Sequence, residues 1–334
     1  MRPSSVRHLV YRGNVAGRIS PKSVDASQTG LFFAQNMLYE HSVTVYDRRL
    51  RLVKTISDAV RLADFGYPQY GGITRGAPVE AAIASGQAYV SNYSMFGSGF
   101  RRPGSDDCSP SDRIDRSFIY RIGLNNLKIN RVIMVGSVPK VVAISPDNHY
   151  VLVSNWCSYT LSVIAVATSK VVRSLYLGPF PRGIVVDPDS RFAYVAVMGS
   201  YDIARVALKD FAITWIRGVG RAPRHLVIDP SAKFLYATLN GEGAVAKISL
   251  ARNEVITKVY GGSQPRSMVI SPDGTALYVV NYGSDTVSKI DASSMRILQV
   301  VHTNQRPIGI TYDDATRAVW VSCYSGSIMV FDDV

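Results

Sequence analysis

Short apolar runs separated by polar turns recur along the chain with a fixed period. In the second half each unit starts at a proline, and the start prolines are 42 residues apart: Pro139, Pro181, Pro223, Pro265 and Pro307. The runs either alternate or are continuously apolar over a few residues, which is typical of strands and not of helices. Since each unit holds four such runs, we predict four short strands in every unit.

Two less regular units precede these five. They start at Pro21 and Pro78, and their greater length places insertions at about 57–77 and 94–116. Seven four-stranded units predict an all-β fold, a seven-bladed β-propeller with four-stranded antiparallel blades and a single domain over residues 1–334. The last unit has only three strands, ending with 327–332. A spare strand at 8–11 is expected to pair with it and close the ring.

Three segments at the second strand of a unit share one motif: YVSN (89–92), LVSN (152–155) and YVVN (278–281). They resemble the repeat of the YVTN-repeat family of seven-bladed propellers, over essentially the whole chain. The resemblance implies that the Tyr packs between sheets and that the Asn makes a turn. Family members are mostly extracytoplasmic, and related propellers include sugar lactonases and electron-transfer domains, so the fold does not assign a function.

The composition narrows the class of partner. The formal net charge is +12, which favours anionic partners. No apolar run reaches 18 residues, so we expect no membrane span. Residues 1–10 lack the apolar stretch of a signal peptide, which leaves two expectations: a cytoplasmic protein, or an exported one whose leader is absent from this chain.

Basic residues recur where each unit begins. They follow the start proline in five units and precede it in the seventh: Lys22, Lys140, Arg182, Arg224, Arg266 and Arg306. The innermost strand of a propeller blade lines the central channel, so these cations are expected to form an anion-binding ring at its mouth. The alternative is that each one belongs to the repeat and bridges to an Asp or a carbonyl of the neighbouring blade.

Aromatic residues recur in the loops between the second and third strands. They are Tyr93, Trp156, Tyr159, Tyr201, Tyr282 and Tyr324. Beside the cations they suit a sugar ring or a base, and Trp156 and Tyr282 are the ligand-binding candidates; alternatively they cover the tops of the blades. The acidic residues at 106, 107, 112 and 115 do not have the spacing of a calcium loop, so we expect a solvated loop.

These residues support three hypotheses of function. The first is a non-catalytic extracytoplasmic binding protein or interaction scaffold, monomeric, that holds an anionic small molecule, an acidic glycan or a partner protein. The second is a lactonase-like hydrolase or lyase at the channel mouth, with Glu80 and His225 as its acid and base. The third is nucleic-acid binding, favoured by the charge. We expect no cofactor and no metal site.

The three cysteines bear on the compartment. Cys108 lies in the second insertion and Cys157 in the matching loop of the next blade, on one face of the ring, so we predict a disulfide between them. Cys323 ends a second strand and should be a buried free thiol. A disulfide indicates an oxidising, extracytoplasmic setting, whereas three unrelated thiols would fit the cytoplasm.

Overall fold

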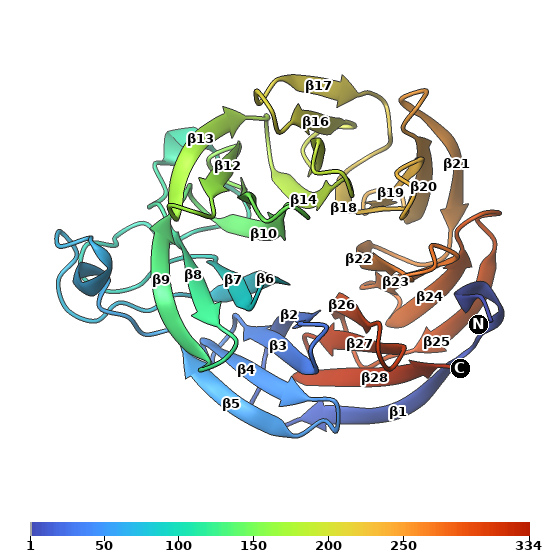
Figure 1. Ribbon diagram of the computed structural model, residues 1–334, viewed down its shortest axis with the longest axis horizontal. Helices are drawn as coiled ribbons and strands as arrows, with labels where there is room; N and C mark the ends of the chain where they lie inside the picture. Colours follow the sequence, from blue (N-terminus) through green and yellow to red (C-terminus); the bar gives the residue numbers. More distant parts are fainter. Residues whose placement is uncertain (1) are drawn as a thin grey trace.

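Seven four-stranded antiparallel sheets surround one axis in the computed structural model, which describes residues 2–334 (Figure 1). The predicted all-β seven-bladed propeller is therefore confirmed. Every inner strand begins at one of the seven start prolines.

The blades are numbered in chain order, and the strands of each run from the axis outward. Blades 1 and 2 are β2 (Pro21–Ala26), β3 (Leu31–Asn36), β4 (Ser42–Asp47), β5 (Leu52–Ser57) and β6 (Pro78–Ala84), β7 (Gln87–Asn92), β8 (Phe118–Gly123), β9 (Lys128–Met134). Blades 3 and 4 are β10 (Pro139–Ile144), β11 (Tyr150–Asn155), β12 (Thr160–Ala165), β13 (Lys170–Tyr176) and β14 (Pro181–Val186), β15 (Phe192–Val197), β16 (Ile203–Ala207), β17 (Ile213–Ile216).

Blades 5 and 6 are β18 (Pro223–Ile228), β19 (Phe234–Leu239), β20 (Ala244–Ser249), β21 (Glu254–Tyr260) and β22 (Pro265–Ile270), β23 (Ala276–Asn281), β24 (Thr286–Asp291), β25 (Ile297–His302). Blade 7 is β26 (Pro307–Asp313), β27 (Ala318–Cys323), β28 (Ser327–Asp333) and, outermost, β1 (Leu9–Ala16). Three short 3-10 helices complete the elements: η1 (Ser4–Val6), η2 (Leu62–Phe65) and η3 (Pro110–Asp112).

The hydrophobic core lies between neighbouring blades. Each second strand is buried on both faces, as in β11, because a blade packs on either side of it. Outer strands such as β13 remain largely exposed. Between blades 3 and 4, for example, Leu152 and Val163 belong to the same buried cluster as Val195 and Ala204.

The repeat motif ties each blade together, as the family resemblance implied. The side-chain amide of Asn155 donates hydrogen bonds to Thr160 Oγ1 and Ser162 Oγ at 3.1 and 2.9 Å. Asn281 bonds Thr286 and Ser288 in the same way, so the Asn fixes the turn between the second and third strands. The motif tyrosines, such as Tyr278, are buried between sheets.

The ring closes through the N-terminal strand, as predicted. β1 pairs antiparallel with β28 from Leu9↔Asp333 to Ala16↔Ser327, and it is longer than the predicted 8–11 because it continues past a bulge near Tyr11 (Figure 1). A buried ion pair reinforces the closure: Lys289 Nζ lies 2.5 Å from Asp333 Oδ1, and both side chains are fully buried. Tyr278 donates a 2.7 Å hydrogen bond to the same carboxylate.

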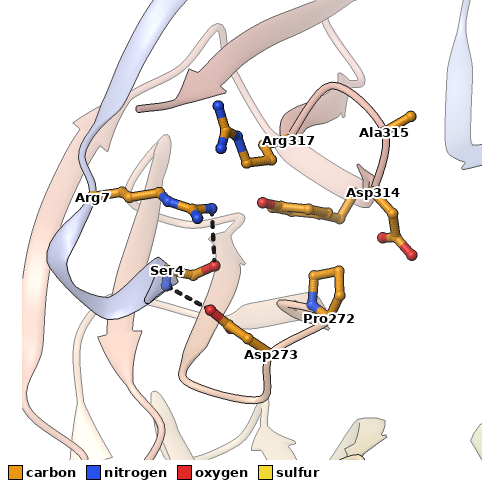
Figure 2. A pocket seen from close by; sticks show the side chains of 8 residues that line it. Ser4, Arg7, Pro272, Asp273, Asp314, Ala315 and Arg317 are labelled. Carbon is orange, nitrogen blue, oxygen red and sulfur yellow. Dashed lines mark hydrogen bonds between the residues drawn. The ribbon is translucent and has the colours of Figure 1, made fainter. Parts of the chain in front are cut away.

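A pocket of about 350 Å³ lies where the N-terminal segment meets blades 6 and 7. Figure 2 shows Ser4 and Arg7 on one side and Asp273 below them. The Ser4 amide donates to Asp273 at 2.7 Å, and Arg7 donates to Ser4 Oγ at 3.4 Å. These bonds anchor the segment that leads into β1.

The two insertions connect β5 to β6 and β7 to β8. The first follows β5; it forms an antiparallel bridge between Val60 and Thr74, and its Leu62 packs in a cluster with Phe118. The second connects β7 to β8 and contains η3. Over residues 2–334, no helix is long and apolar enough to cross a membrane.

Candidate functional site

A β-bulge in the inner strand of blades 2 to 6 positions the candidate residues. In blade 4, Pro181 pairs with Val197 and Ile184 with Val195, so that two residues, Arg182 and Gly183, oppose one. The same pairing recurs in blades 2, 3, 5 and 6. Bulges turn side chains away from the regular strand pattern and are frequent next to functional sites.

Four of the predicted cations and the two candidate catalytic residues occupy these bulges. Lys140, Arg182, Arg224 and Arg266 are first bulge residues, while Glu80 and His225 are second ones. Hydroxyl groups of the preceding blade hold the bulges in place: Ser154 donates to the Arg182 carbonyl at 2.7 Å, and Thr238 to the Arg266 carbonyl at 3.0 Å.

Close packing of the inner strands fixes the distance between bulges. A Cβ atom on Gly183 would lie 2.6 Å from the Arg224 carbonyl oxygen and 2.7 Å from His225 Cα. Only glycine allows this approach, because both contacts are with backbone atoms. The cations of blades 4 and 5 are therefore held close to each other.

The structure brings five of the six predicted cations together at the axis. This axial basic cluster consists of Lys22, Lys140, Arg182, Arg224 and Arg266, of which all but Arg266 are buried. Arg306 does not join it: its side chain is exposed, and its backbone amide donates to Asp285 Oδ1 at 2.7 Å. Because Arg306 precedes its proline, it lies in the loop before β26 and not in the inner strand.

Three members of the cluster have carboxylate partners. Lys22 Nζ lies 2.9 Å from Glu80 Oε1, and Arg182 lies 4.0 Å from the same oxygen. Lys140 Nζ lies 2.6 Å from Asp106 Oδ1. For Lys22 and Lys140 the expected bridge to a neighbouring blade is present, since Glu80 and Asp106 both belong to blade 2, which lies between blades 1 and 3.

Arg224 and Arg266 have no such partner. Among residues 2–334 no carboxylate lies within 4.0 Å of either guanidinium group, and the side-chain contact of Arg224 is Met198 Sδ at 3.8 Å. The Arg266 Nε atom is buried without a hydrogen-bond partner. Burial first, and then the charge of Arg182, lower the pKa of both arginines. A guanidinium stays protonated in proteins, so each group carries a positive charge that no carboxylate within 4.0 Å compensates among residues 2–334.

Several of the predicted aromatic residues lie beside the cluster. The Arg266 guanidinium lies 4.1 Å from the centre of the Tyr282 ring, and Lys140 Nζ lies 5.2 Å from that of Trp156. Tyr282 and Tyr324 meet edge to face at 6.1 Å. Tyr201 is 58 % exposed, which fits a residue at the surface of its blade. Tyr282 and Tyr324 are partly exposed.

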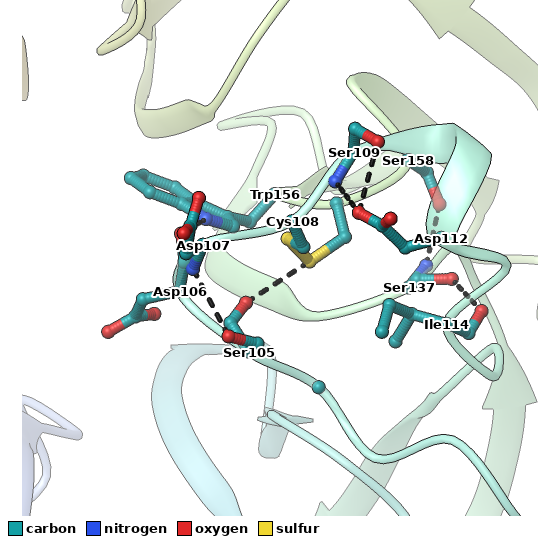
Figure 3. The surroundings of a disulfide bond; sticks show 12 residues. Ser105, Asp106, Asp107, Cys108, Ser109, Asp112, Ile114, Ser137, Trp156 and Ser158 are labelled. Carbon is teal, nitrogen blue, oxygen red and sulfur yellow. Dashed lines mark hydrogen bonds between the residues drawn. A yellow bond between two sulfur atoms is a disulfide. The ribbon is translucent and has the colours of Figure 1, made fainter.

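The predicted disulfide between Cys108 and Cys157 is confirmed, with 5.4 Å between the Cα atoms. Figure 3 shows how it fastens the second insertion beside Trp156, whose indole Nε1 donates to the Asp106 carbonyl at 2.9 Å. Asp106 is exposed, as a solvated loop requires, but its ion pair with Lys140 was not predicted. Cys323 is a buried free thiol, as predicted.

Glu80 and His225 lie near each other but do not form an acid–base pair. Within residues 2–334, neither a hydrogen bond nor an ion pair joins them, and His225 Nδ1 is buried without a partner. Although burial opposes the shift, Lys22 and Arg182 lower the pKa of Glu80. Burial and the surrounding cations lower the pKa of His225 to about 4, so its ring is neutral at pH 7.

Two acidic residues were not predicted to lie near the cluster. Asp25 lies in β2, where burial and then Glu80 raise its pKa well above the ordinary value. Asp106 lies in the irregular insertion, where Lys140 lowers its pKa to about 2 although burial opposes this. The 42-residue repeat signals neither, because both lie outside the regular units.

Comparison with known proteins adds one finding. A family model described as a YNCE-like beta-propeller matches residues 122–307. The matched region contains four members of the axial basic cluster and leaves out Lys22, Glu80 and Asp106. No curated protein matches the chain.

Proposed function

The chain belongs to the YNCE-like β-propeller family, which defines its fold, and we propose that it is a non-catalytic binding protein that holds an anionic ligand at the axis of the ring. The ligand's anion contacts Arg224 and Arg266, and Tyr282 and Trp156 flank the rest of the molecule. Residues 1–334 act as one folding unit and as a monomer.

One observation carries this proposal: two arginines of the cluster lack a counter-ion. Arg224 is 4 % exposed, and its neighbours on both sides are also arginines. A buried charge without a partner is costly, and stability alone does not favour such an arrangement. An anion with bidentate geometry would compensate it, because guanidinium groups suit carboxylate and phosphate oxygens.

Binding is favoured over hydrolysis at this site. A general base needs a pKa near the working pH, whereas Glu80 is kept ionised by Lys22 and Arg182. The disulfide supports an extracytoplasmic location, since such a bond persists in oxidising compartments.

Calorimetric titration tests the proposal, with citrate as the first probe and hexuronate and acetate as further anions. The double variant Arg224→Met with Arg266→Met should lose at least tenfold in affinity, while far-UV circular dichroism shows an intact fold. The control is Arg306→Gln, which removes an exposed arginine outside the cluster and should leave binding unchanged. Equal affinity of the double variant, or no binding of any anion, would contradict the proposal.

A further inference from the structure

The axial basic cluster holds more positive than negative charge. Its five cations face two ionised carboxylates, Glu80 and Asp106. With Asp25 protonated and both lysines charged, the excess is three positive charges. Burial and the charge of Arg182 lower the pKa of Lys140 to about 7, and the excess is two where Lys140 is neutral. A ligand that carries one negative charge would leave at least one cation uncompensated.

The excess lies on the side of the three arginines. Lys22 and Lys140 have their own carboxylates at 2.9 and 2.6 Å, whereas Arg224 and Arg266 have none within 4.0 Å among residues 2–334. Arg182, Arg224 and Arg266 come from the same bulge position of three successive blades. They therefore surround one region, and the Tyr324 hydroxyl lies close enough to interact electrostatically with all three guanidinium groups.

We propose that the group recognised at this site is a phosphate dianion, carried by a monoester or by free phosphate, that is held by Arg182, Arg224 and Arg266, with the Tyr324 hydroxyl as a further donor. This inference rests on the proposed function and specifies its ligand. A terminal phosphoryl group presents three oxygens and carries nearly two charges above pH 7, because its second pKa is about 6. A carboxylate offers two oxygens and one charge, and a phosphodiester also carries one charge.

Asp106 and Glu80 add to the preference for a ligand that carries both charges on one group. They neutralise the two lysines and leave Arg224 and Arg266, whose guanidinium groups suit bidentate binding of phosphate, without a carboxylate within 4.0 Å among residues 2–334. The two carboxylates also repel any second anion, so a ligand with acidic groups spread along its length binds less well than one with both charges on a single phosphorus centre.

The charge of the probe can be changed by pH. A hexose 6-phosphate is about one-tenth dianionic at pH 5 and nearly all dianionic at pH 7.5, whereas sulfate is a dianion at both. The proposal predicts that the affinity for the hexose phosphate, divided by that for sulfate, rises about tenfold between these two values. Protonation changes of the protein itself affect both affinities alike and cancel in this ratio. The groups that face the site are Lys22, Lys140, Glu80, Asp106, Asp25, His225 and Tyr324.

Inorganic phosphate and dimethyl phosphate are titrated into the protein at pH 7.5 as comparison ligands. A hexose phosphate that binds at least as tightly as inorganic phosphate identifies an organic ester, and weaker binding identifies free phosphate; both results support the dianion. Dimethyl phosphate should bind at least tenfold more weakly than the hexose phosphate. Arg224→Met should lose at least tenfold in affinity for the hexose phosphate, and Arg306→Gln should lose nothing.

Two results would overturn the inference: a ratio that stays constant between pH 5 and 7.5, or dimethyl phosphate that binds as tightly as the monoester. If citrate or acetate binds through Arg224 while the phosphate esters do not, the proposed function stands and only the ligand class is wrong. If no anion binds, both are wrong.

Discussion

Replacing Arg224 by methionine should stabilise the ligand-free protein. The guanidinium is buried, has no carboxylate within 4.0 Å among residues 2–334, and lies between Arg182 and Arg266. Apolar replacement of buried ionic groups is often stabilising by about 1–4 kcal/mol. We expect about 1–2 kcal/mol here, because the substitution also removes the contact between the Arg224 guanidinium and Met198 Sδ. A binding residue that lowers stability is the usual cost of a site prepared for its ligand.

The matched control is Lys289→Met, the same apolar replacement at a buried cation that has a partner. Lys289 and Asp333 are fully buried and 2.5 Å apart, so removing the ammonium leaves a buried carboxylate. Loss of one partner costs about 3–5 kcal/mol, and we expect about 3, because Tyr278 and Arg7 still contact Asp333. The two substitutions should therefore change stability in opposite directions.

Urea denaturation followed by circular dichroism measures both effects, in a buffer without phosphate, sulfate or carboxylate anions. The midpoint should rise for Arg224→Met and fall for Lys289→Met, with unchanged slopes. Added citrate or hexose phosphate should stabilise the wild type and not the Arg224 variant. If Arg224→Met lowers the free energy of unfolding by more than about 1 kcal/mol in this buffer, the arginine stabilises the ligand-free fold and the reasoning is refuted.

Three further outcomes are expected. Deletion of residues 2–16 removes β1 and should lower the melting temperature of the single unfolding transition, because the edge of β28 is then unpaired; an unchanged value would show that closure contributes nothing. A thiol assay in denaturant without reductant should find one thiol, Cys323, and three would disprove the Cys108–Cys157 bond. Burial raises the pKa of Asp58 to about 6, against the pull of His41 and Arg75. The folded protein therefore holds a proton that the unfolded chain has released, so the contribution of Asp58 to stability is present below about pH 4 and is lost as the pH rises through 6. Urea denaturation at several pH values should show that Asp58→Asn reduces the fall in the free energy of unfolding between pH 4 and 6. The same fall in the variant and the wild type would contradict this assignment.

The architecture and much of the site could be predicted because both are repeated. The 42-residue period gave the start prolines, and each of them begins an inner strand. The residue after the start proline is basic in five units and lies at the axis in all five, and in blades 3 to 6 it occupies the same position of the same bulge. The disulfide followed from two loops on adjacent blades.

The rest depends on contacts that do not repeat. Asp106 reaches Lys140 through an insertion whose path no periodicity describes. Glu80 pairs with Lys22 across a blade boundary, and that partner depends on the geometry of the bulge. Arg306 was misplaced because a basic residue before the proline was treated as equivalent to one after it, and the shift by two positions leaves it in the loop.

The most direct test of the central claim is an anomalous difference map from a crystal grown without oxyanions and soaked in selenate. Selenate is a tetrahedral dianion whose selenium can be located unambiguously. We predict a peak at the axis with oxygens within hydrogen-bond distance of the Arg224 and Arg266 guanidinium groups, and its absence from crystals of the Arg224→Met variant. A map without density there, with both guanidinium groups turned onto carboxylates of neighbouring blades, would contradict the account.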